Sequence, residues 1–103
     1  MKYRTIGNTG VKVSEICWGT DMLGGLVSLQ EAEQIIETLR HHGVNFLDTA
    51  DAYQHGQSES LLGKLIQDDR NRWVLATKTG NSRSSKDKGP FLTRDRILKG
   101  IQA

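Results

Sequence analysis

The sequence predicts an α/β fold in which short parallel strands alternate with helices. Two observations support this prediction. The sequence has three short apolar segments, and each is followed by a segment with apolar residues at helical spacing. A hairpin-like pattern precedes all three. Such alternation implies strands joined by right-handed crossovers, with helices covering the sheet. The 103 residues fit one domain, and no low-complexity linker divides them.

The N-terminal segment is expected to form a β-hairpin. Strand-type alternation over residues 3–5 and 11–13 flanks residues 7–10, where two glycines and an asparagine suit a tight turn. A third short run, residues 16–19, is interpreted as a buried strand leading into a glycine-rich loop. Within it we expect Cys17 to be a small buried hydrophobe rather than a reactive thiol.

A first helix is expected to begin after Ser28. Glu31 stands at the capping-box spacing, and Gly43 offers a left-handed C-terminal cap. Between them, apolar residues recur at helical spacing: Leu29, Ala32, Ile35, Ile36 and Leu39.

The rest of the chain repeats this order. We expect a strand at residues 44–47, a helix from near Ser58, a polar loop at 68–71 and a strand at 73–77. A loop at residues 81–89 and a helix capped by Thr93 complete the chain. Trp18 and Trp73 fall within strand segments and are expected to pack in the core.

Composition excludes several classes of protein. The net charge of +2 is too small for nucleic acid or an anionic membrane surface, and no apolar run is long enough to span a bilayer. No Cys, His and carboxylate cluster has metal-ligand spacing. Because Cys17 is the one cysteine and the N-terminus lacks a signal-peptide pattern, we expect a cytoplasmic location.

Two charged residues follow predicted strands directly. Asp48 and Lys78 stand at carboxyl-terminal strand ends, where ligands bind in parallel α/β folds. Opposite charges at neighbouring strand ends are costly to bury unless they pair, so we predict an Asp48–Lys78 ion pair. The alternative is an unpaired, solvated rim of charges.

Tyr53 lies five residues beyond Asp48, within reach of the same rim. An adjacent ammonium group stabilises a phenolate and makes a tyrosine hydroxyl a better proton donor. With Asp48 holding Lys78 charged, the three residues would form a general-acid group for reducing a carbonyl, provided that a hydride source lies nearby.

The residues around this group resemble the aldo-keto reductase family, and its bacterial branch in particular. Four parts of the sequence carry the resemblance. They are residues 3–14, Gly19–Thr20, residues 43–50 followed by Glu59 and residues 62–63, and residues 76–78. These segments match in order and spacing over essentially the whole chain.

The resemblance implies an NADP(H)-dependent oxidoreductase on a (β/α)₈ barrel, of which residues 1–103 would form the N-terminal part: a hairpin plug and three βα units. Asp48, Tyr53 and Lys78 would be catalytic, with Tyr53 as the general acid. The cofactor-binding residues would be Gly19, Thr20, Asp21 and Asp48. The family's catalytic histidine would lie beyond this chain, since neither His41, His42 nor His55 matches its position.

Three hypotheses follow. The full-length protein would reduce a small carbonyl substrate, or it would be a non-catalytic cofactor-binding or interaction subunit of the same fold. Alternatively, the chain alone would be an inactive truncated fragment. Such a fragment would self-associate through its open barrel edges.

Overall fold

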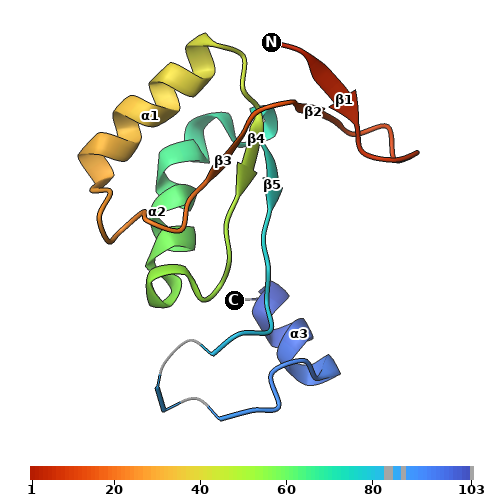
Figure 1. The fold of residues 1–103 in the computed structure, drawn as a ribbon, viewed down its shortest axis with the longest axis vertical. Helices are drawn as coiled ribbons and strands as arrows, with labels where there is room; N and C mark the ends of the chain where they lie inside the picture. Colours follow the sequence, from red (N-terminus) through yellow and green to blue (C-terminus); the bar gives the residue numbers. More distant parts are fainter. Residues whose placement is uncertain (83–84, 87, 103) are drawn as a thin grey trace.

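The structure is a computed structural model that describes residues 1–82, 85–86 and 88–102. A two-stranded hairpin precedes a three-stranded parallel sheet with the strand order β3-β4-β5 (Figure 1). The hairpin consists of β1 (Tyr3–Thr5) and β2 (Lys12–Ser14). The sheet consists of β3 (Cys17–Gly19), β4 (Phe46–Asp48) and β5 (Val74–Ala76). The predicted α/β alternation is confirmed.

The hairpin is fixed to the amino-terminal end of β4. Asn45, the residue before that strand, accepts a hydrogen bond from the Ser14 backbone N–H (2.7 Å) and donates one from Nδ2 to the Lys12 carbonyl (3.0 Å). The Tyr3 hydroxyl donates to the Gly43 carbonyl at 2.5 Å. The hairpin therefore lies at the end of the sheet opposite to the strands' carboxyl ends (Figure 1).

The three predicted helices form, and two of them make the core. Helix α1 (Leu29–His41) has the predicted Ser28–Glu31 capping box and is followed by Gly43 at φ 75°. Helices α1 and α2 (Gln57–Ile66) lie on one side of the sheet, whereas α3 (Arg94–Gln102) lies beyond its carboxyl end (Figure 1). Apolar side chains buried between helices and sheet include Leu23, Ala32, Ile36, Leu47, Leu62, Ile66 and Trp73.

The expectation that β3 and Cys17 are buried is wrong, and the side of the sheet facing away from α1 and α2 explains why. Strand β3 is present, but it is not buried, and Cys17 is exposed. Its register partners Phe46 and Val74 share its side of the sheet, and in the described part of the chain no helix covers that side. Trp18 points the other way and packs against the core, as Trp73 does.

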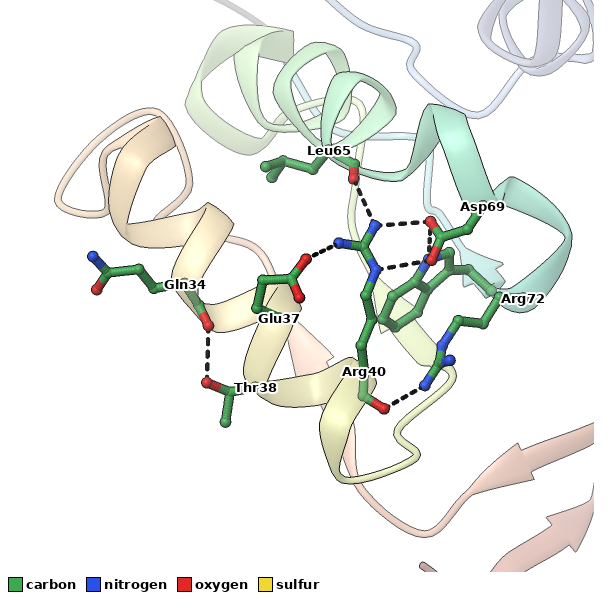
Figure 2. Close-up of polar contacts among 8 residues, drawn as sticks. Gln34, Glu37, Thr38, Arg40, Leu65, Asp69 and Arg72 are labelled. Carbon is green, nitrogen blue, oxygen red and sulfur yellow. Dashed lines mark hydrogen bonds and ion pairs between the residues drawn. The ribbon is translucent and has the colours of Figure 1, made fainter.

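The polar segment before β5 also differs from expectation. Residues 68–71 lie within a 3-10 helix, η2 (Gln67–Arg72), rather than in an irregular loop. The Asp69 carboxylate accepts hydrogen bonds from Arg40 Nε (2.8 Å), Arg40 Nη2 (2.9 Å) and Trp73 Nε1 (3.0 Å). Figure 2 shows how Arg40 joins α1 to this turn, with further contacts to Glu37 and the Leu65 carbonyl. These hydrogen bonds hold the pKa of Asp69 below its ordinary range.

The predictions for the last segment are confirmed where they can be tested. Residues 81–82, 85–86 and 88–89 contain no helix or strand, while residues 83, 84 and 87 of the predicted loop lie outside the described residues. The Thr93 hydroxyl accepts a hydrogen bond from the Arg96 backbone N–H at 3.3 Å, as expected of a helix N-cap.

Candidate active site

Asp48 and Lys78 form the predicted ion pair at the carboxyl end of the sheet. Lys78 Nζ donates to Asp48 Oδ2 at 2.7 Å and to the Thr49 carbonyl at 2.7 Å. The two side chains keep 48% and 38% of their surface exposed, so the pair is open to a ligand. The alternative of an unpaired, solvated rim is therefore wrong.

Tyr53 completes the group. It opens the 3-10 turn η1 (Tyr53–Gly56), and Lys78 Nζ lies 4.9 Å from the centroid of its ring. Partial desolvation alone would lower the pKa of Lys78, but its interactions with Asp48 and Tyr53 outweigh that effect and raise the pKa. Lys78 is thus a persistent cation between a carboxylate and a phenol.

The backbone after Tyr53 is unusual and explains the sharp return into α2. Gln54 (φ 48°), His55 (φ 57°) and Gly56 (φ 93°) all have left-handed conformations, which is uncommon for the first two residue types. Gln54 Nε2 donates to the Asp21 carbonyl at 2.8 Å. This hydrogen bond ties the turn behind Tyr53 to the loop after β3.

A buried hydroxyl cluster fixes the predicted cofactor-binding segment. Thr20 is 1% exposed, and its backbone N–H donates to the Asp48 carbonyl at 2.9 Å. The Ser58 hydroxyl donates to the Thr20 carbonyl at 2.7 Å and lies within hydrogen-bond distance of the Thr20 and Thr49 hydroxyls. The cluster joins the ends of β3 and β4 to α2, and Gly19 is the register partner of Asp48. Asp21 is held separately, through the hydrogen bond from Gln54 to its carbonyl.

The neighbours of Asp48 in the sheet are small residues. Gly19 and Ala76 are the register neighbours of Asp48 on either side, and both are small. In the described part of the chain, a Cβ at Gly19 would meet no heavy atom within 4 Å. The described residues hold no group of three metal-ligating side chains. Small residues thus flank Asp48 on both neighbouring strands.

Three polar residues near the site were not predicted from the sequence to belong to it. Ser58 is fully buried, and Asp51 is 7% exposed and accepts a hydrogen bond from the Thr79 hydroxyl at 2.7 Å. Asp51 stands between two alanines, and Thr79 follows Lys78 after a strand end. Their position beside Tyr53 and Lys78 is the signal that could have identified them.

None of the described helices combines the length and the apolar character that crossing a membrane requires.

Comparison with known proteins gives consistent similarities. The family model "Aldo/keto reductase family" matches residues 15–103. The chain is 34% identical over 108 residues to "Probable voltage-gated potassium channel subunit beta" of Arabidopsis thaliana, covering 100% of this chain and 32% of that protein. It is also 34% identical over 108 residues to "Aldo-keto reductase YhdN" of Bacillus subtilis, covering 99% and 33%.

A solved structure is similar over nearly the same span. The holo form of an aldo-keto reductase from Bacillus halodurans, AKR11C1, superposes with a TM-score of 0.83 at 31% identity. The match covers 99% of this chain and 34% of that one. The chain thus spans about a third of the length of the curated relatives it matches.

Proposed function

Because this chain belongs to the aldo/keto reductase family of oxidoreductases and has the fold of the N-terminal part of its (β/α)₈ barrel, we propose that the protein containing it is an NADP(H)-dependent reductase. Its substrates are aldehydes or ketones, which it converts to alcohols. The observation that carries this proposal is the contact group of Asp48, Lys78 and Tyr53 at the carboxyl end of the sheet. A cytoplasmic location, expected from the sequence, is part of the same proposal.

In the proposed reaction Tyr53 is the general acid. Its hydroxyl donates a proton to the carbonyl oxygen while a hydride adds to the carbonyl carbon, so the C=O bond becomes an alcohol. The Lys78 ammonium, 4.9 Å from the ring centroid, stabilises the phenolate that Tyr53 leaves behind. The phenolate regains a proton from solvent after the product departs.

Asp48 acts on Lys78. With Asp48 Oδ2 at 2.7 Å and the Thr49 carbonyl at 2.7 Å, two of the ammonium's three protons are held by the protein. These contacts fix the ammonium beside Tyr53 and keep it charged, consistent with the raised pKa of Lys78.

The residues present fit a nicotinamide cofactor. A reduced nicotinamide, when bound, supplies the hydride that the chain's own side chains lack. Gly19, Thr20, Asp21 and Asp48 would hold its ring. The fixed backbone of Thr20 and the pairing of Gly19 with Asp48 support this placement.

The test is carbonyl-dependent oxidation of NADPH by a full-length protein that contains this chain. We expect turnover on a panel of aldehydes and ketones, and faster turnover with NADPH than with NADH. No turnover with either cofactor would contradict the proposed reaction, while a preference for NADH would contradict the cofactor assignment alone.

A second candidate function is a non-catalytic, cofactor-binding subunit of another assembly. The similarity to the protein named a probable potassium channel β subunit is the observation that favours it. The assay separates the two candidates. Tight NADPH binding without turnover on any carbonyl supports the subunit, whereas turnover that depends on Tyr53 supports the reductase.

We also propose that the 103-residue chain by itself is inactive and self-associates. Both β3 and β5 are edge strands of the described sheet, and Ile16 (57%), Leu26 (84%) and Ile101 (76%) are strongly exposed. Sedimentation of the isolated chain, with far-UV circular dichroism, is expected to show oligomers or incomplete folding. A stable, fully folded monomer would contradict this prediction.

A further inference from the structure

We infer that Asp51 and Thr79 act together as positioning residues that hold Tyr53 and Lys78 beside each other. This inference rests on the proposed function, since these are the residues to which that function assigns the proton transfer. Asp51 lies two residues before Tyr53, and Thr79 directly follows Lys78. Contact between Asp51 and Thr79 therefore ties together the two backbone segments that carry the proposed acid and its charged neighbour.

Besides the hydrogen bonds of Lys78 Nζ, three others join these segments beyond the end of the sheet. The Thr49 N–H donates to the Ala76 carbonyl at 2.9 Å, and the Asp51 N–H donates to the Lys78 carbonyl at 3.0 Å. The Thr79 hydroxyl then donates to Asp51 Oδ2 at 2.7 Å. The first two bonds belong to the backbone, whereas side chains make the third. Substitution can therefore remove the third bond and leave the other two possible.

The contact is well placed to be strong. Asp51 is 7% exposed and Thr79 is half-buried. Helix α3 lies directly over the pair at Gly100, where a Cβ would be 3.1 Å from Thr79 Oγ1 and 3.9 Å from Asp51 Oδ2. A hydrogen bond to a carboxylate gains strength when water is kept away from it. Because Gly100 has no side chain, α3 can lie this close to the Asp51–Thr79 hydrogen bond.

Single hydrogen bonds connect the segment that contains Asp51 to Tyr53 and to Lys78. The Tyr53 N–H donates to the Ala50 carbonyl at 3.1 Å, and Lys78 Nζ donates to the Thr49 carbonyl at 2.7 Å. Movement of residues 49–51 relative to residues 78–79 would therefore change the place of the Tyr53 ring and one of the contacts of Lys78. A displacement of about 1 Å at reacting groups can cost roughly 100-fold in rate.

Thr79→Val is the decisive variant, because it removes the hydroxyl without changing charge or size much. Thr79→Ser restores the donor. Thr77→Val is the matched control, since the Thr77 hydroxyl donates to the carboxylate of Glu59 at 2.5 Å and not to Asp51. We expect Thr79→Val to lower kcat by about 10- to 100-fold, with the KM for NADPH little changed. Thr79→Ser and Thr77→Val should remain within a factor of about two or three of the wild type.

A second readout is independent of activity. In the full-length protein, the ammonium ¹⁵N–¹H signal of Lys78 at mildly acidic pH reports its contacts with Asp48 and Thr49, because hydrogen bonds slow its exchange with water. Lys78→Arg assigns the signal. We expect it in the wild type, Thr79→Ser and Thr77→Val, and expect it to broaden or vanish in Thr79→Val. If Thr79→Val folds poorly, Thr79→Ala replaces it.

The outcomes separate the two proposals. The inference is overturned if Thr79→Val keeps both the Lys78 signal and the wild-type kcat. A lower free energy of unfolding alone would then show a purely structural role for Thr79. A wild type without the Lys78 signal also overturns the inference. If the wild type shows no carbonyl turnover, the proposed function fails, while the Lys78 signal still decides whether Asp51 and Thr79 position that side chain.

Discussion

Replacing Tyr53 with phenylalanine is expected to lower kcat for carbonyl reduction by about 10²- to 10⁴-fold, the contribution usual for a general acid. The substitution removes one hydroxyl and leaves the ring against which Lys78 Nζ packs at 4.9 Å. NADPH affinity should therefore change little. Steady-state oxidation of NADPH by the full-length protein, together with cofactor titration, measures both quantities.

The chain offers a matched control for this experiment in its other tyrosine. The Tyr3 hydroxyl donates to the Gly43 carbonyl at 2.5 Å, at the opposite end of the sheet. Tyr3→Phe removes the same atom, and we expect it to affect stability without affecting kcat. Undiminished turnover by Tyr53→Phe would show that another group supplies the proton.

Replacing Asp69 with alanine is expected to lower the free energy of unfolding by about 2–3 kcal/mol. Loss of one partner from a buried ion pair typically costs more, but Arg40 and Asp69 retain 26% and 30% exposure, which reduces the effect. The variant also leaves Nε1 of the buried Trp73 without this acceptor. Urea unfolding of the full-length protein measures the change.

Asp68→Ala is the control, since Asp68 is an exposed neighbour on the same turn. We expect it to change the free energy of unfolding by less than about 0.5 kcal/mol. Because the pKa of Asp69 is lowered from 3.8 in the folded state, its stabilisation is present above that value and is lost as the pH falls through the lower, folded pKa. The difference between the wild type and Asp69→Ala should shrink over that acidic range. Equal losses for Asp68→Ala and Asp69→Ala would contradict the structural role of Asp69.

Much of the fold could be predicted because local signals agreed with each other. Ser28 with Glu31 marked the start of α1, and Gly43 marked its end. The Asp48–Lys78 pair could also be predicted, since parallel strands bring their carboxyl ends to one edge of the sheet. Short-range patterns and one topological rule were enough for these features.

The errors arose where tertiary contacts decide the outcome. Cys17 has an apolar neighbourhood in sequence, yet its exposure depends on whether anything covers its side of the sheet. Asp69 lies in a polar run, and nothing local distinguishes it from Asp68. Its partner Arg40 is 29 residues away. Asp51 was overlooked for the same reason, because its partner Thr79 lies beyond the next strand.

The position of the hairpin has a practical consequence for labelling. Its turn, residues 7–10, is exposed and lies at the end of the sheet opposite to Lys78 and Tyr53. Exposed turns of this kind usually accept insertions and attached groups. A fluorophore or an immobilisation tag placed there would leave the carboxyl end of the sheet clear, so ligand binding could be followed on a surface or by fluorescence without obstructing the site.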